Sequence, residues 1–450
     1  MLRLTPALLP LLLLLLQLPL ALIPGYLSHD DLQWLARADV PWSAISWVSW
    51  VDFSSLQYRP LAFNLWLVLA HLFGGSPRLM HTLFVLIGTA NAWLLARVIV
   101  GMQVSARVAY ASAVVFALSP YAIYVHGWTG TLADLLTLLL GLTAARCLQR
   151  AASAADPNAI VLNAVAATVL AAVALLCKES AIVLPALLAI VALRAPLRKP
   201  SIAALTIAAL IAVGYVAMRP ALAESVQIDP AYAWSLRHVP AHFAEYSLYP
   251  FMPPLFEIGP LLSKSAPRIA VAAGCLALLL AALASAGLRW PVIWLVAFTV
   301  ALGPVLLLPV AYDHYAYLAA AAAIAVCASA WTSLGRFARG AMLAVATVVV
   351  LHGLAVMSRL YTVGVIQRNL CDDLLAELRN STAPLHVAAA DPRDAWLIGR
   401  LLRGVQSYRG VPFAARVHFG EDGPAASGDR PLRMNRDGHL QVSAPPLTPD

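Results

Sequence analysis

Long apolar segments recur along most of the chain, and they decide what it can fold into. A helix needs about 20 mostly apolar residues to cross a bilayer. Hydrophobic residues make up 61% of the 450 residues and charged residues only 12%, where a soluble domain carries roughly 25%. The sequence therefore predicts an all-α polytopic membrane protein. The eleven predicted spans are residues 4–24, 79–100, 107–125, 132–149, 160–176, 180–196, 201–218, 268–287, 291–310, 316–334 and 340–358.

Positive charge sets the predicted orientation, because cytoplasmic loops carry an excess of Lys and Arg. With Arg3 in the cytoplasm and alternate crossings, the basic clusters all fall on the cytoplasmic side: Arg97 and Arg107; Arg146 and Arg150; Arg194, Arg198 and Lys199; Arg289; Arg336 and Arg339. These loops account for the net charge of +8. No basic run with interleaved aromatics is present, so no nucleic-acid partner is predicted.

Two long loops lie on the outer side of this topology. Residues 28–78 contain LAFNLWLVLAHLFGG, which is apolar but short for a span, and we predict interfacial helices there. Five Trp residues near it suit the headgroup layer: Trp34, Trp42, Trp47, Trp50 and Trp66. The second loop runs from about residue 219 to 268 and is rich in aromatic residues and proline.

The composition changes after about residue 359. LHVAAADPRDAWLIGRLLRG reads as a strand followed by a helix, and AARVHF reads as a second strand. We predict a transmembrane domain over residues 1–358 and a small α/β appendage over residues 359–450. An odd number of spans puts the appendage outside, although its arginines suit the cytoplasm equally well.

Ionisable residues gather on the predicted outer face, where charges at membrane depth are functional candidates. They come from distant parts of the chain: Asp30 and Asp31; Tyr58 and Arg59; His126 and Asp134; Lys178 and Glu179; Asp313 and His314. Each has a simpler reading. Asp30 could cap a helix that begins near Leu32, and Arg59 could reach toward headgroups. The others could be local ion pairs, caps or turn residues.

Together these residues suit one kind of chemistry. A carboxylate can act as general base on an acceptor hydroxyl or amine. The cations Arg59 and Lys178 can hold a phosphate leaving group. A second acid can orient the cations or bind a divalent metal. The sequence thus favours group transfer from a phosphate-linked lipid at the outer interface. No CxxC or His/Cys spacing among the five cysteines suggests zinc or a redox pair.

Ordered sequence blocks resemble a known family. They are SHDD, YRPLAFNLWLVLAHLFGGSPRLMHTLFVLIGTANAWLL, SPYAIYVHGWTGTLADLL, LLCKESAIVLP, HFAEYSLYPFMPP and YDHYAYLAA, within residues 1 to about 330. The chain resembles the GT-C superfamily of membrane glycosyltransferases. It is most similar to the protein O-mannosyltransferase and aminoarabinose-transferase branch, including bacterial relatives of mannosyltransferases with tetratricopeptide tails. The tail of this chain has no such repeat.

The resemblance implies a GT-C-like fold and roles for individual residues. The catalytic base maps to Asp30 or Asp31, with Asp30 favoured, and the second outer-loop acid maps to Asp134. Arg59 and Lys178 would bind the donor phosphate. The supporting residues would be Tyr58, His126, Glu179, Asp313 and His314. Asp30, Asp31 and Asp134 are also the candidate ligands of a divalent cation, Mg²⁺ or Mn²⁺, whose requirement the sequence leaves open.

The implied function is an inverting glycosyltransferase in the bacterial inner membrane, with its site facing the periplasm or the outside. Its donor would be a polyprenyl-phosphate sugar, and lipid, glycan and protein acceptors all remain open. Two alternative functions are also consistent with the sequence. A transporter or flippase of lipid-linked sugars would also use intramembrane charges, although the acids here lie at span ends and no internal repeat is visible. A non-catalytic envelope scaffold is the third.

Overall fold

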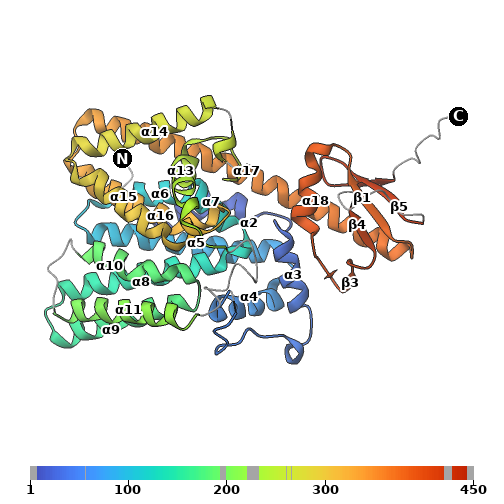
Figure 1. Ribbon diagram of the computed structural model, residues 1–450, viewed down its shortest axis with the longest axis horizontal. Coiled ribbons are helices and arrows are strands. Elements are labelled where there is room, and N and C mark those ends of the chain that lie inside the picture. Colours follow the sequence, from blue (N-terminus) through green and yellow to red (C-terminus); the bar gives the residue numbers. More distant parts are fainter. Residues whose placement is uncertain are drawn as a thin grey trace.

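Helices dominate the computed structural model, which describes residues 8–55, 57–192, 199–219, 233–259, 261–264, 266–419 and 428–442. Most helices run side by side in one bundle, and a smaller C-terminal domain projects from its end (Figure 1). The bundle contains α1 (Leu8–Leu16), α2 (Leu18–Ala21), α5 (Pro77–Gly101), α6 (Ala106–Ala117), α7 (Pro120–Gly127), α8 (Leu132–Ser153), α9 (Pro157–Leu175), α10 (Leu184–Ala192), α11 (Lys199–Ala217), α14 (Ala266–Ser285), α15 (Arg289–Leu302), α16 (Tyr317–Ala330) and α17 (Arg336–Asn380).

Within the described residues, eight helical segments are long and apolar enough to cross a membrane, or nine if the bent pair α6–α7 is one span. This confirms a polytopic helical protein. Two of the eleven predicted spans fall on shorter helices: residues 4–24 on α1 and α2, and residues 180–196 on a 3-10 turn, η3 (Glu179–Val183), followed by α10. The ends of both, with Arg3, Arg194 and Arg198, lie outside the described residues. The count of eleven therefore stays a proposal.

Two predicted spans differ in shape from the expectation. Residues 107–125 do not form one straight helix, because α6 ends at Ala117 and α7 begins at Pro120, with a bend of 61° between them. Pro120 lacks the N–H that a continuous helix would need. The last predicted span, 340–358, is part of α17, which has 45 residues and continues to Asn380. Helix α17 thus crosses the predicted domain boundary at residue 359 without a break.

The first outer loop contains the two helices α3 (His29–Ala38) and α4 (Pro60–Phe73). Helix α4 has 14 residues and is too short to span. Trp42, Trp47 and Trp50 are exposed, as a headgroup layer would require, but Trp66 is buried. The expectation for Trp66 was wrong, because its indole N–H donates to the Thr129 carbonyl at 2.7 Å inside the protein.

Helix α13 (Val239–Leu248) belongs to the second outer loop, together with the short 3-10 turns η6 (Leu236–His238), η7 (Tyr249–Phe251) and η8 (Leu261–Ser263). Other 3-10 turns adjoin the long helices: η1 (Trp42–Ala44), η2 (Thr129–Thr131), η9 (Gly303–Leu307), η10 (Asp313–Ala316) and η11 (Trp331–Ser333). Turns η2 and η10 begin the segments that continue into α8 and α16. They therefore set how those helices enter the bundle.

The C-terminal domain has the strand–helix–strand order that the sequence predicts. Strand β1 (Leu385–Ala389) precedes η12 (Pro392–Asp394) and α18 (Ala395–Leu402), and β4 (Val417–Phe419) pairs parallel to β1. The four-stranded sheet has the order β4-β1-β5-β6, in which β5 (Arg430–Met434) is parallel to β1 and antiparallel to β6 (Leu440–Val442). A separate hairpin joins β2 (Ser407–Tyr408) and β3 (Val411–Pro412).

Candidate functional site

Four of the predicted site residues come together in two ion pairs, one partly buried (Arg59–Glu179) and one almost completely buried (Lys178–Asp134). Arg59 Nε donates to Glu179 Oε2 at 2.8 Å, and Lys178 Nζ donates to Asp134 Oδ1 at 2.5 Å. Arg59 caps the N-terminus of α4, and the Leu61 N–H donates to the Leu176 carbonyl at 3.1 Å. That backbone bond holds the start of α4 against the end of α9, so Arg59 meets the Lys178–Glu179 turn.

A third cation, which the sequence reading missed, joins this group. Arg219 Nη1 lies 3.9 Å from Glu179 Oε1, and Arg219 also donates to the Tyr215 hydroxyl and the Ser55 carbonyl. In the sequence, Arg219 directly follows an apolar helical segment, and this position could have identified it as a candidate. We call Arg59, Lys178, Arg219, Asp134 and Glu179 the cation cluster.

The cation cluster combines three cationic and two anionic side chains. The side chains of Lys178 and Asp134 are only 3% and 10% exposed. Buried charges are tolerated only when they are paired and hydrogen-bonded. Cationic side chains that lie close together in low-dielectric surroundings are suited to binding an anion, because the interaction is strengthened there.

Aromatic side chains enclose the cation cluster. Lys178 Nζ lies 4.8 Å from the centre of the Tyr315 ring, and His314 packs against Tyr315 and Trp128 at 4.4 and 5.4 Å between ring centres. His314 is therefore beside the cluster, as predicted. Tyr58 is buried, and its hydroxyl donates to the Trp50 carbonyl at 2.6 Å. Tyr58 thus braces the first outer loop, since its hydroxyl is engaged there.

The aspartate pair lies at the start of α3, and its two members differ. Ser28, not Asp30, is the N-cap, and its hydroxyl accepts from the Asp30 N–H at 3.3 Å. The capping interpretation of Asp30 was therefore wrong. The Asp30 side chain is 50% exposed and lies 3.3 Å from His29 Nε2. Only Asp30 is accessible to an acceptor molecule.

Asp31 is completely buried. Its carboxylate accepts from the Leu27 N–H at 3.1 Å and from the Thr129 hydroxyl at 2.8 Å. Loss of hydration raises the pKa of Asp31 to about 7, although these two hydrogen bonds oppose the increase. Asp31 is thus held in place by its neighbours and closed to substrate.

Thr129 connects the aspartate pair to the cation cluster. It begins the segment η2–α8, on which Asp134 follows five residues later. Five residues of helix span about 7.5 Å along the axis. Trp128, which directly precedes Thr129, packs against His314, the histidine beside the cation cluster. One helical segment, η2–α8, therefore contacts Asp31 through Thr129 and Lys178 through Asp134.

Two predicted supporting residues lie elsewhere. His126 is buried among helices, where its Nδ1 contacts the Gln17 side chain and its Nε2 lies 2.7 Å from the Tyr317 hydroxyl. The same hydroxyl accepts from Asn91 at 3.1 Å, so His126 belongs to a network that joins four helical segments. Asp313 is buried and accepts from the Ile258 N–H at 3.0 Å. It anchors the loop that follows η7.

The C-terminal domain contacts this face around α18, where Arg400 makes several of the polar contacts. Its side chain contacts Glu257, donates to the Leu27 carbonyl at 3.0 Å and donates to the Tyr124 hydroxyl at 3.1 Å. No local sequence signal pointed to Arg400, because its partners lie between 143 and 373 positions away. A cleft of about 730 Å³ lies between the C-terminal half of α3, the end of α4 and the β2–β3 hairpin.

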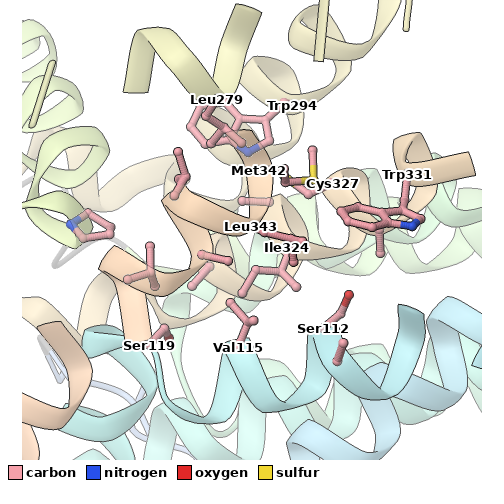
Figure 2. A pocket seen from close by; sticks show the side chains of 18 of the residues that line it. Ser112, Val115, Ser119, Leu279, Trp294, Ile324, Cys327, Trp331, Met342 and Leu343 are labelled. Carbon is pink, nitrogen blue, oxygen red and sulfur yellow. The ribbon is translucent and has the colours of Figure 1, made fainter. Parts of the chain in front are cut away.

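An apolar cavity of about 550 Å³ lies inside the bundle, among α6, α14, α15, α16 and α17 (Figure 2). Trp294, Ile324, Met342 and Leu343 line it, with Ser112 and Ser119 on the α6 side. One end is formed by Tyr121 and Tyr246. The Tyr246 hydroxyl accepts from the Tyr312 N–H, next to Asp313 and His314. The cavity therefore leads from the membrane interior toward the site face.

The described residues bring no group of three or more His, Cys, Asp or Glu side chains close enough to hold a metal ion. Asp30, Asp31 and Asp134 do not form the predicted metal site, because each carboxylate has a different partner. Comparisons of the chain with protein-family models, curated proteins and solved structures give no match. The resemblance to the GT-C superfamily thus stays a prediction.

Proposed function

We propose that this chain is a GT-C-like membrane glycosyltransferase that moves a sugar from a polyprenyl-phosphate donor to an acceptor at the outer face of the membrane. One observation carries the proposal. Partly buried cationic side chains are combined with an exposed carboxylate at the start of α3 and with an apolar cavity among the long helices. A donor with a phosphate, a sugar and a long apolar chain would engage all three features.

In the proposed reaction, Asp30 accepts the proton of the acceptor hydroxyl or amine. The freed electron pair attacks the anomeric carbon, and the bond between that carbon and the phosphate oxygen breaks on the opposite side of the ring. The configuration at the carbon is thereby inverted. Arg59 and Lys178 stabilise the departing polyprenyl phosphate, which carries the negative charge. Asp134 and Glu179 keep these cations in place, and no step requires a metal ion.

Arg59 and Lys178 would both bind the phosphate, each in a different way. The planar Arg59 guanidinium can bind two phosphate oxygens, and the Lys178 ammonium acts as a point charge. Both cations are now paired with carboxylates, so phosphate would compete with Glu179 for Arg59. Arg219 would stay with Glu179 and keep its carboxylate partnered in that state.

The test is donor cleavage by purified protein in nanodiscs, with a radiolabelled polyprenyl-phosphate sugar and fractionated envelope material as acceptor. We expect Asp30→Asn to lower the rate by roughly 10² to 10⁴-fold, the usual contribution of a general base. Asp52→Asn is the matched control, because Asp52 is an exposed carboxylate of the same outer loop. It should leave the rate unchanged.

Full activity of a folded Asp30→Asn variant would remove the proposed base. Movement of intact donor across the bilayer without cleavage would instead favour the transporter reading. Neither cleavage nor movement would favour a scaffold. Mass spectrometry of envelope glycans, lipids and proteins, with and without the gene, would then name the sugar and the acceptor.

A further inference from the structure

We propose that Arg400, in the C-terminal domain, positions the Asp30–Asp31 pair, so that this domain is an integral part of the site rather than an appendage. The inference rests on the proposed function for its kinetic consequence. Its structural content, that one residue of the C-terminal domain fixes the start of α3, stands on the geometry alone.

The Arg400 side chain acts on Asp31 through the Leu27 peptide. Arg400 Nε donates to the Leu27 carbonyl at 3.0 Å, and the Leu27 N–H donates to Asp31 Oδ2 at 3.1 Å. Leu27 is itself completely buried. Its backbone is thus held from both sides, and the turn before α3 cannot move without breaking one of the two bonds.

The Arg400 backbone acts on Asp30 through His29. The Arg400 carbonyl accepts from His29 Nδ1 at 2.9 Å. A carbonyl can only accept, so Nδ1 carries the hydrogen and the ring is oriented with Nε2 toward Asp30, 3.3 Å from Oδ1. One residue therefore connects to both members of the pair by separate routes.

The surroundings of Arg400 hold it in this place. Its side chain is 15% exposed, and its charge is balanced by Glu257 in the loop after η7. Glu257 Oε1 also lies 3.3 Å from the Tyr124 hydroxyl, to which Arg400 donates. Nearby, the Gln33 side chain donates to the Arg403 carbonyl at 3.1 Å. Helices α3, α7 and α18 thus meet at Arg400.

The proposed role is positional. The observed Arg400 side-chain contacts are to protein groups: Leu27, Tyr124 and Glu257. Loss of Arg400 should therefore misalign the base while leaving the donor site, formed by the cation cluster and the cavity, intact. A small misplacement of a reacting group costs up to about a hundredfold in rate.

The experiment compares Arg400→Gln, Arg400→Lys, the double variant Arg400→Gln/Glu257→Gln and the control Arg433→Gln in the full-length protein in nanodiscs. Arg433 is an exposed arginine on β5 of the same domain. The double variant keeps the test valid if an unpaired Glu257 alone impairs folding. Hydrogen–deuterium exchange is measured on peptides that cover residues 25–38, and donor cleavage is measured as kcat and KM.

We expect Arg400→Gln and the double variant to raise exchange in residues 27–31 at least tenfold, because the start of α3 opens more often. We expect kcat to fall roughly ten- to a hundredfold with KM for the donor unchanged. Arg400→Lys should recover part of both effects, and Arg433→Gln should match the wild type.

Unchanged exchange at residues 27–31 in the Arg400→Gln protein would overturn the inference. So would wild-type kcat in a preparation where Asp30→Asn is inactive, or a rise in KM alone. If the wild type cleaves no donor, the proposed function fails while the exchange data still decide whether Arg400 fixes the pair.

Discussion

At the scale of single residues, the charged side chains of the site face differ in burial and in the partners that hold them. The exposed member of the aspartate pair, Asp30, is free to meet a substrate, whereas Asp31 is enclosed. Lys178 and Asp134 form an ion pair that is almost completely shielded from solvent. These assignments lead to two stability predictions that do not depend on the reaction.

Asp31→Asn should make the folded protein more stable at pH 8 than the wild type. Burial raises the pKa of Asp31 from 3.8 to about 7. Below about pH 4 the carboxyl is protonated in both folded and unfolded chains, so ionisation costs nothing. Between about pH 4 and pH 7, Asp31 is ionised in the unfolded chain but still protonated in the folded one, so the free energy of unfolding of the wild type falls as the pH rises. The total loss is up to about 4 kcal/mol, at 1.36 kcal/mol per pKa unit.

Thermal unfolding in detergent between pH 5 and pH 8 measures this difference. Asparagine can still accept from the Leu27 N–H and can donate to the Thr129 oxygen, so the hydrogen bonds survive. The gap between variant and wild type should widen as the pH rises. A gap that stays constant with pH, or narrows, contradicts the assignment.

Lys178→Met should destabilise the protein by about 3–5 kcal/mol, because it leaves the buried Asp134 carboxylate without a partner. The double variant Lys178→Met/Asp134→Leu should recover a large part of this loss, since no unpaired charge remains. Thermal unfolding of both single variants and the double variant forms the cycle. If the losses of stability in the two single variants simply add in the double variant, the two charges do not depend on each other.

At the scale of elements, the site depends on how helices cross. Helix α17 passes two backbone segments at glycines on one face, Gly353 and Gly364, which are 11 residues or three helical turns apart. A side-chain carbon at Gly353 would lie 1.8 Å from the Leu118 carbonyl oxygen, and one at Gly25, before α3, would lie 2.3 Å from the Gly364 carbonyl oxygen. Close backbone approach therefore fixes α17 against the turns that precede α7 and α3.

Gly353→Ala should destabilise the bundle by about 1–3 kcal/mol or more, because backbone at Leu118 cannot move aside as a side chain can. Gly340→Ala is the matched control on the same helix, since nothing lies within 4 Å of a carbon added there. It should be neutral or stabilising, as alanine favours helix over glycine by up to about 1 kcal/mol. Equal unfolding temperatures for the two variants would contradict the close crossing.

At the scale of the whole molecule, the two ends of the bundle carry different charged residues. Arg97 and Arg146 meet at one end, where the Arg146 guanidinium donates to the Arg97 carbonyl at 3.1 Å. The acids of the site lie at the other end, with α3 and the C-terminal domain. By the positive-inside rule, we predict that the end with Arg97 and Arg146 faces the cytoplasm and that the C-terminal domain lies outside.

A membrane-impermeant maleimide should label Ser54→Cys and Gln441→Cys in intact cells but not Ala155→Cys, which should react only after permeabilisation. All three positions are exposed. Ser54 lies in the first outer loop, Gln441 in the C-terminal domain and Ala155 in the turn between α8 and α9 at the other end. The unsubstituted protein measures labelling of the native cysteines.

Different labelling of Ser54→Cys and Gln441→Cys would contradict the contact between the C-terminal domain and the site face. Labelling of Ala155→Cys alone would reverse the orientation and place the proposed site in the cytoplasm.

The sequence by itself determined the class of protein, most of the long helices and the strand–helix–strand order of the tail. These follow from hydropathy, which is a property of consecutive residues. Proline at position 120 was a local signal for the bend, and Ser28 was a local signal for the true N-cap of α3. Both could have been read from the sequence.

Only the tertiary structure decided which charges meet. Arg59 and Glu179 are 120 positions apart, and Arg400 lies 373 positions from Leu27. Such pairs depend on how each helix is rotated about its axis and where it crosses its neighbours, which no local pattern encodes. The same packing exposes Asp30, buries Asp31 beside Thr129 and draws His126 into the bundle interior. Hydropathy determined where the helices lie in the sequence, and helix packing determined which polar side chains meet.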